Sequence, residues 1–329
     1  MPLVIHIGMQ KTGTTFLQQV LSQNSAELAE RGLIYPSPRA GLPGGGGSAH
    51  HFLAHAVLRL RVNYTPKGDF ALLPDHVTAL RGILDAGIGV GVISSEDFSR
   101  MRSKQIQTLR AHFPGEDVRI LVYLRRQDLW LDALYGQALK VGRQIDLETF
   151  IARNRRRLDY ARLLRHWANA FGRENLIVRI YEGFEEGGLW ADFCHAVGCP
   201  AAVDLPARDL SVNVSLSYEA SMFLSAITDR ERRHRLRMLL EEGEAAGRRR
   251  PALKYIDTRQ AKALMAEFAD SNAEVARDYF DRDALFENAS PVPARGARHP
   301  LVRHLVVARS LLRGVLATRF GTRAGRSGG

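Results

Sequence analysis

The chain has 329 residues, of which 45% are hydrophobic and 25% are charged, a composition that is typical of a globular protein and excludes a disordered one. The formal net charge is +11 at pH 7, but residues 289–329 contain eight arginines and no acidic residue. Subtracting these 8 from 11 leaves +3 for the rest, so the sequence predicts no nucleic-acid partner. We expect one domain over residues 1–288 and a basic tail over residues 289–329.

The first 181 residues alternate between short apolar runs and patterns of helical spacing. A helix is predicted at Thr14–Leu28, and strands are predicted at Leu3–Ile7, Ile88–Ser94, Val118–Leu124 and Leu176–Tyr181. Because strands that alternate with helices form parallel sheets with both faces covered, the predicted fold class is α/β, with a parallel β-sheet flanked by helices. Glycine-rich residues 41–48 are predicted to be a flexible loop, and residues 210–288 are predicted to be helical C-terminal additions.

The basic tail mixes leucine and valine with spaced arginines from Leu301 to Phe320. This pattern is compatible both with an amphipathic helix that lies on anionic lipid and with an unstructured basic end that has no partner, and the two alternatives stay open. The chain begins without a charged leader and contains no apolar run of membrane-spanning length. We therefore expect a cytoplasmic protein, with the tail as a means of peripheral contact with the inner face of the membrane.

The clearest local motif is Gly8-Met-Gln-Lys11-Thr12-Gly13-Thr14-Thr15, which lies where the first strand gives way to a helix. Glycines there allow a ligand to approach the backbone, and the N-terminus of the helix carries a partial positive charge. Lys11 and the three threonine hydroxyls complete a set of groups suited to an anion. The motif therefore predicts a phosphate-binding loop.

In a Walker A loop the lysine follows the second glycine, whereas Lys11 precedes Gly13. This order resembles the 5′-phosphosulfate loop of the sulfotransferases that use 3′-phosphoadenylyl sulfate (PAPS). The resemblance implies a P-loop NTPase-like sulfotransferase fold and a nucleotide-binding site for PAPS, with 3′,5′-adenosine bisphosphate as the product. It also implies that Lys11, Thr12, Gly13, Thr14 and Thr15 bind this donor.

Two further matches follow the third and fourth predicted strands. The family grips the 3′-phosphate with an arginine and a serine; Arg125 matches the arginine, but Ala133 stands where the serine is expected. Replacement donors are available in the same region from Arg126, Tyr135 and Gln137. Tyr181 resembles the family tyrosine that lies against adenine, while the Arg-Lys-Gly signature of the cytosolic small-molecule enzymes is missing.

The resemblance also assigns catalytic roles. Lys11 would stabilise the charge that builds on the leaving phosphate. The acceptor hydroxyl needs a base, for which Glu96, at the end of a strand, is the first candidate and His51 the second, with His50 behind it. This chemistry needs no metal, and no ligand cluster in the sequence suggests one; Cys194 and Cys199 are expected to be free thiols.

The acceptor class rests on weaker similarity. The phrases His50-His51-Phe-Leu-Ala, Ile93-Ser-Ser-Glu96 and Ser271-Asn272 resemble bacterial sulfotransferases that act on polysaccharides or lipid-linked sugars, which implies a carbohydrate or glycolipid acceptor. Two alternatives remain open. One is a P-loop kinase or nucleotide-binding protein, and the other is a non-catalytic adaptor at the membrane surface.

Overall fold

The computed structural model describes residues 2–43, 47–60, 70–114, 117–182, 184, 188–205, 216–245, 255–286, 307–308 and 311–312. The chain divides into two compact units, the first made of residues 1–125, 160–211 and 277–281 and the second of residues 126–159, 212–276 and 282–329. The chain therefore leaves the first unit after residue 125 and returns to it at residue 160. The single domain expected over residues 1–288 stays a prediction.

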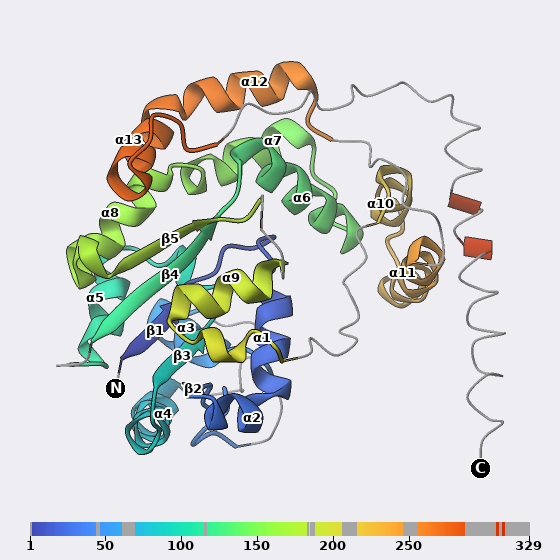
Figure 1. Ribbon diagram of the computed structural model, residues 1–329. Helices are drawn as coiled ribbons and strands as arrows, with labels where there is room; N and C mark the ends of the chain where they lie inside the picture. Colours follow the sequence, from blue (N-terminus) through green and yellow to red (C-terminus); the bar gives the residue numbers. More distant parts are fainter. Residues whose placement is uncertain are drawn as a thin grey trace, which may run out of the picture. The chain divides into compact units, whose positions relative to one another are not determined.

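The first unit contains a five-stranded parallel sheet with the strand order β2-β3-β1-β4-β5 (Figure 1). The strands are β1 (Leu3–His6), β2 (Leu33–Ile34), β3 (Val90–Ser94), β4 (Val118–Leu124) and β5 (Leu176–Ile180). The first strand lies at the centre because both β3 and β4 pair with it. This arrangement confirms the α/β class with a parallel sheet flanked by helices.

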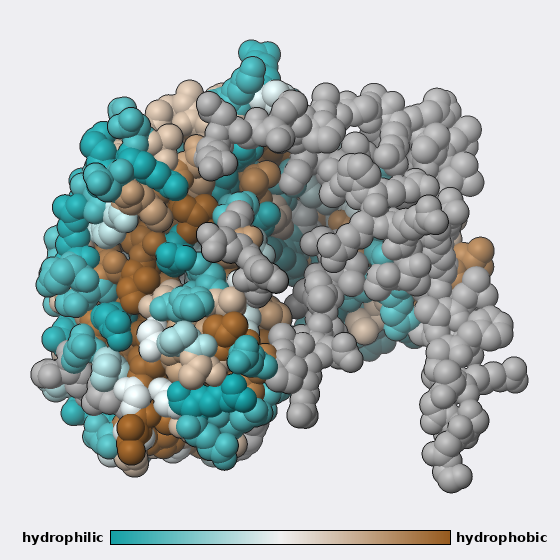
Figure 2. Space-filling view, viewed as in Figure 1, coloured by the Kyte–Doolittle hydropathy of each residue, from teal (hydrophilic) through white to brown (hydrophobic). Residues whose placement is uncertain are grey.

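Helices cover both faces of this sheet. They are α1 (Thr14–Gln23), α2 (Ser25–Glu30), α3 (His51–Leu58), α4 (Leu73–Ala86), α5 (Ser103–Ala111), α8 (Tyr160–Phe171) and α9 (Gly188–Val197). One face of the sheet packs against α1, α2 and α9, whose apolar residues share a core cluster with alternate residues of the strands, including Leu121 and Tyr123. On the opposite face, α8 contacts β4, β5 and α5. Hydrophobic and hydrophilic residues are interspersed over the side of this unit seen in Figure 2.

Several elements differ from the sequence prediction, and the strands β1 and β5 each end one residue earlier than predicted. The second predicted strand starts at Val90 instead of Ile88, because Ile88 is 88% exposed and Gly89 has a φ of 113°. The predicted helix at 14–28 is broken at Asn24 into α1 and α2. The two-residue strand β2 was not predicted, because it is too short to show an alternating pattern.

The second unit is helical in its described residues. It contains α6 (Gln127–Lys140), α7 (Leu147–Asn154), α10 (Tyr218–Ser225), α11 (Arg230–Ala245), α12 (Thr258–Glu267) and the first part of α13 (Ala269–Phe280). Helices α7, α10 and α12 each contact α6. The Asp132 carboxylate on α6 accepts hydrogen bonds from the backbone N–H groups of Tyr255 and Ile256, 2.6 and 3.0 Å away. The helical additions predicted from residue 210 onward are thus confirmed wherever the structure describes them.

Most of the basic tail and residues 44–46 of the glycine-rich loop lie outside the described residues. Two tail residues are exceptions, since Val307 and Leu311 pack with α10 and α11 in an apolar cluster. These two tail residues therefore contact protein. None of the helices in the described ranges combines the length and the apolar character that crossing a bilayer requires.

Gly89 gives a test of the packing at the start of β3. A Cβ at this position would lie 2.0 Å from the Gly32 carbonyl oxygen and would require a left-handed backbone at φ 113°. Gly89→Ala should lower the free energy of unfolding by about 2–4 kcal/mol, from a backbone clash added to strain. Gly82→Ala is the matched control, because Gly82 lies within α4 and, apart from the neighbouring backbone of that helix, no described atom would lie within 4 Å of the added Cβ.

Urea-induced unfolding measures both variants. The control should be neutral or gain about 0.5–1 kcal/mol, since alanine is the better helix former. Equal stabilities for the two variants would contradict the proposed clash.

Candidate functional site

The carboxyl ends of four strands meet at one edge of the sheet. The loop of residues 7–13 follows β1, Glu96 lies two residues past β3, Arg125 directly follows β4 and Tyr181 directly follows β5. All belong to the first unit. In open parallel sheets this edge is where ligands bind. The structure therefore collects the predicted loop, arginine, tyrosine and glutamate at one candidate site.

The loop turns tightly through three positive φ angles, of 41° at Gly8, 64° at Lys11 and 72° at Gly13. Two hydroxyls hold this shape from inside, because Thr12 Oγ1 and Thr14 Oγ1 donate to the Met9 carbonyl oxygen over 2.7 and 3.1 Å. A left-handed lysine is strained, and such strain persists where the surrounding structure enforces it. The loop is thus built around its own carbonyl, with Thr12 and Thr14 buried and Thr15 exposed.

Neither glycine of the loop leaves room for a side chain. A Cβ on Gly13 would lie 2.2 Å from Leu189 Cδ2, and one on Gly8 would lie 3.2 Å from the Glu96 Cα atom. The first contact comes from α9 and the second from the residues after β3. These close approaches place Glu96 directly beside the start of the loop.

Arg125 connects the loop to the end of β5. Its Nη1 donates to the Lys11 carbonyl oxygen at 2.9 Å, and its Nε donates to Glu182 Oε1 at 2.8 Å. The guanidinium also lies over the Tyr181 ring, 5.1 Å from its centroid. Arg125 thus binds the strained residue of the loop, an aromatic ring and a carboxylate at the same time.

Arg126 and the residues near Ala133 belong to the second unit. Both Arg126 nitrogens Nε and Nη2 donate to the buried Asp128 carboxylate, at 2.7 and 2.6 Å, so that its donor fork is occupied. Tyr135 is also engaged, since its hydroxyl donates to the Ile145 carbonyl oxygen at 2.9 Å. Gln137 is half-buried on α6. The donor role expected of these residues stays a prediction.

Buried polar groups join β1, β3, α1 and α3 beneath the loop. Ser94 Oγ, at the end of β3, lies 2.9 Å from His6 Nδ1 and accepts a hydrogen bond from Gln18 Nε2 at 3.1 Å. The Ser94 backbone pairs with His50, because its N–H donates to His50 Nδ1 at 3.2 Å and its carbonyl accepts from the His50 N–H at 2.8 Å. Burial lowers the pKa of His50 to about 3. His50, expected to stand behind His51 as a base, is therefore a buried neutral group that fixes the start of α3.

His6 makes the stability of the protein depend on pH. Burial lowers its pKa from the ordinary 6.5 to about 3, so between these values the unfolded chain binds a proton that the folded chain excludes. The stabilisation is complete above pH 6.5 and is lost as the pH falls toward 3. For one such histidine the loss is about 2 kcal/mol between pH 7 and pH 5.

We expect His6→Asn to reduce this pH-dependent loss by that amount, since asparagine does not bind a proton in this range. Urea-induced unfolding at both pH values gives the difference, and His195→Asn on the exposed side of α9 is the control. The assignment fails if His6→Asn keeps the pH dependence of the wild type.

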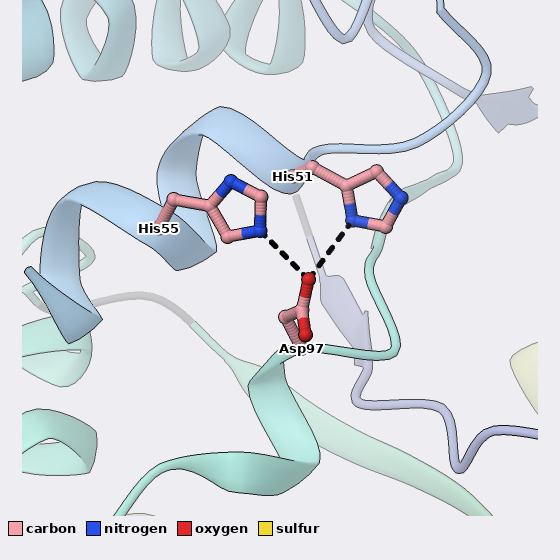
Figure 3. A group of neighbouring side chains, drawn as sticks. All are labelled: His51, His55 and Asp97. Carbon is pink, nitrogen blue, oxygen red and sulfur yellow. Dashed lines mark hydrogen bonds and ion pairs between the residues drawn. The ribbon is translucent and has the colours of Figure 1, made fainter. Parts of the chain in front are cut away.

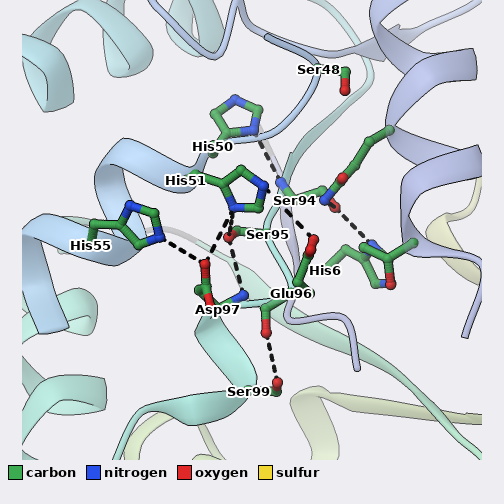
Figure 4. A network of polar contacts seen from close by, with 12 residues as sticks. His6, Ser48, His50, His51, His55, Ser94, Ser95, Glu96, Asp97 and Ser99 are labelled. Atoms are coloured by element: carbon green, nitrogen blue, oxygen red, sulfur yellow. Dashed lines mark hydrogen bonds and ion pairs between the residues drawn. The ribbon is translucent and has the colours of Figure 1, made fainter. Parts of the chain in front are cut away.

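His51, Glu96 and Asp97 lie together beside the loop, with His55 one turn further along α3 (Figure 4). His51 Nδ1 is 2.9 Å from Ser95 Oγ and 3.6 Å from Asp97 Oδ2, and His51 Nε2 is 3.9 Å from Glu96 Oε2. Asp97 Oδ2 is also 2.7 Å from His55 Nε2, and Asp97 Oδ1 accepts from Arg100 Nη1 at 2.9 Å. The hydrogen bonds to His55 and Arg100 lower the pKa of Asp97 to about 2 against the opposing effect of burial, so it is a carboxylate at neutral pH.

The group of His51, His55 and Asp97 was not predicted (Figure 3). One nitrogen or oxygen atom of each lies within 4.8 Å of the others, close enough to hold a metal ion. The sequence carried a signal, because His51 and His55 are four residues apart and so share one face of a helix. The full cluster does not show in the sequence, because Asp97 joins the group from a different element.

No family model matches the sequence. The chain is 31% identical to an uncharacterized protein from Archaeoglobus fulgidus over 201 aligned residues. The aligned region covers 57% of this chain and 53% of the relative, so the chain spans about half the length of that relative. A sulfotransferase from Alicyclobacillus acidocaldarius is 17% identical, with a TM-score of 0.47 over 85% of this chain and 96% of that one. Neither similarity assigns an activity to this chain.

Proposed function

We propose that the protein is a PAPS-dependent sulfotransferase, which moves a sulfuryl group to a hydroxyl acceptor. The observation that supports this most is the meeting of the strained lysine loop, Arg125, Tyr181 and Glu96 at the carboxyl edge of one sheet. This reaction needs a loop that binds the 5′-phosphosulfate and an arginine that binds the 3′-phosphate. It also needs an aromatic ring that lies against adenine and a carboxylate that accepts the proton of the acceptor hydroxyl.

The donor would lie along the loop. Because the Thr12 and Thr14 hydroxyls donate to Met9, the backbone N–H groups at the start of α1 and the Lys11 side chain are the groups offered to the 5′-phosphosulfate. Arg125 would bind the 3′-phosphate in place of Glu182, since guanidinium binds phosphate through paired hydrogen bonds. Tyr181, next to Gly13, would lie against adenine.

In the transfer step, the acceptor oxygen forms a bond to sulfur while the bond from sulfur to the 5′-phosphate oxygen breaks. The leaving oxygen takes the electron pair, and Lys11 stabilises its new charge. The hydroxyl proton goes to a base, with Glu96 first and His51 second. Glu96 Oε2 is a buried atom that accepts no hydrogen bond from the described part of the chain, which suits it to receive that proton.

A nucleotide kinase is the alternative. It would need a carboxylate for magnesium near the loop, typically after a strand. In the part of the chain that the structure describes, Glu96 and Asp97 both follow β3 near the loop, and Asp97 is already paired with His55 and Arg100. The position of Lys11 before Gly13 favours the sulfotransferase. The carbohydrate or glycolipid acceptor rests on sequence resemblance, and peripheral membrane contact through the tail stays a hypothesis.

Ligand-induced thermal shifts test the donor. The wild type should be stabilised more by 3′,5′-adenosine bisphosphate than by AMP or ATP. In Arg125→Ala the preference for the bisphosphate over AMP should disappear, with binding weakened about 30-fold by the loss of about 2 kcal/mol of charged hydrogen bonding. If Arg125→Ala still binds AMP, the variant has lost the contact to the 3′-phosphate and the loop is intact. If AMP binding is lost as well, the loop has collapsed.

The matched control is Arg31→Ala, which removes an arginine paired with Glu27 on α2. It should keep the preference of the wild type. Stronger stabilisation by ATP than by the bisphosphate would contradict the proposal and favour the kinase.

Lys11→Met tests the chemistry. Release of 3′,5′-adenosine bisphosphate from PAPS, measured with water and with a panel of neutral oligosaccharides, should fall about 100- to 1,000-fold, because the leaving oxygen loses its cation. Lys104→Met, on the exposed side of α5, should match the wild type. Unchanged turnover in Lys11→Met would rule out this role for the lysine.

A further inference from the structure

Asp97 is a buried carboxylate that the proposed reaction leaves without a role. Its side chain is 6% exposed, and it lies between three potential partners, His51, His55 and Arg100. Arg100 Nη1 binds one carboxylate oxygen. The almost completely buried His55 Nε2 binds the other, as Figure 3 shows. A carboxylate fixed through both oxygens cannot rotate, so the direction from which it acts on His51 is set by the fold.

His51 also lies beside Glu96. Its ring carries two nitrogens in different surroundings, as Figure 4 shows. Nδ1 faces Ser95 Oγ at 2.9 Å and Asp97 Oδ2 at 3.6 Å, whereas Nε2 faces Glu96 Oε2 at 3.9 Å. The partner of one ring nitrogen determines which nitrogen of a neutral imidazole carries the proton.

The balance favours a proton on Nδ1. Asp97 Oδ2 is nearer to the ring and belongs to a carboxylate that His55 and Arg100 hold in place, whereas Glu96 Oε2 is further away and accepts no hydrogen bond from the described part of the chain. The 2.9 Å between Nδ1 and Ser95 Oγ is a hydrogen-bond length, whereas Asp97 Oδ2 at 3.6 Å from Nδ1 and Glu96 Oε2 at 3.9 Å from Nε2 are both too far for a hydrogen bond. Asp97 therefore acts on the ring through its charge. With the proton on Nδ1, His51 Nε2 and Glu96 Oε2 are two acceptors that face each other 3.9 Å apart. The hydroxyl of an acceptor molecule would lie between these two atoms.

We propose that Asp97, clamped by His55 and Arg100, is a positioning residue that keeps the His51 proton on Nδ1 and directs Nε2, as a proton acceptor, toward Glu96. The proposal rests on the proposed function. His51 and Glu96 then form one proton-accepting site. As the acceptor oxygen bonds to sulfur, its proton passes to the lone pairs of this site, and Asp97 stabilises the imidazolium that forms if the ring receives it.

A metal ion bound by His51, His55 and Asp97 is the competing explanation of the same cluster. The observed contacts favour the hydrogen-bonded network. Asp97 Oδ2 and His55 Nε2 are 2.7 Å apart, which is a hydrogen-bond length, and the Arg100 guanidinium already neutralises the carboxylate. A second cation there would have to overcome that charge.

Nuclear magnetic resonance tests the tautomer without any assay of activity. In protein labelled with ¹⁵N-histidine, the His51 signals, assigned by their loss in His51→Gln, should show the proton on Nδ1 at neutral pH. In Asp97→Asn that preference should be lost. The control Asp192→Asn, which removes a carboxylate of α9 that pairs with Arg179 of β5, should keep it. A wild-type proton on Nε2 would overturn the proposal, whether or not the protein is a sulfotransferase.

Kinetics with PAPS and water as the acceptor test the consequence. Asp97→Asn should lower kcat about 10- to 100-fold with an unchanged KM for the donor, the range found when a residue that orients another is removed. The same change in a His51→Gln background should have no further effect, because Asp97 acts through His51. Independent losses in the double variant, or activity that a chelator removes and zinc restores, would overturn the role.

These outcomes are separable from the failure of the proposed function. If the wild type neither binds the bisphosphate nor turns over PAPS, the sulfotransferase assignment fails, and the tautomer of His51 is still measured. If the wild type is active and Asp97→Asn is equally active, the assignment stands and the positioning role fails.

Discussion

The candidate site depends on how the chain satisfies the last peptide group of β3. Beyond Ile34 the neighbouring strand β2 has ended, so the backbone of Ser94 has no strand to pair with on that side. His50 takes the place of that strand: its ring nitrogen Nδ1 accepts a hydrogen bond from the Ser94 N–H, and its own N–H donates to the Ser94 carbonyl oxygen. A buried peptide group without a partner would cost about 1–3 kcal/mol, so this pairing fixes where α3 begins. His51, the next residue, is thereby placed beside Glu96.

The other side of Ser94 carries the same constraint into the loop. Its hydroxyl binds His6 at the end of β1 and Gln18 in the second turn of α1, the two elements that the loop connects. One serine therefore links the loop that is proposed to bind the donor to the residues that are proposed to accept the proton. Because the interior around it is closely packed, a change at this point displaces both halves together.

Much of the site was predictable because its residues follow apolar runs. Lys11, Glu96, Arg125 and Tyr181 each come shortly after a strand that the sequence shows clearly, and parallel strands bring their carboxyl ends together. The orientations were not predictable. That the Thr12 hydroxyl points inward depends on the left-handed backbone at the preceding residue, and no pattern of residue types encodes it. The contact between Asp97 and His55 joins residues 42 positions apart, which periodicity does not report.

The brevity of β2 has an effect beyond the site. A long exposed edge strand presents a row of free N–H and C=O groups to which a strand of another molecule can add. Here the strand at one border of the sheet has only two residues, and past it a histidine ring takes up the peptide group that would otherwise continue the ladder. At that border the sheet offers little template for intermolecular growth, and the residue that closes the ladder there, His50, is the one that places His51 beside Glu96.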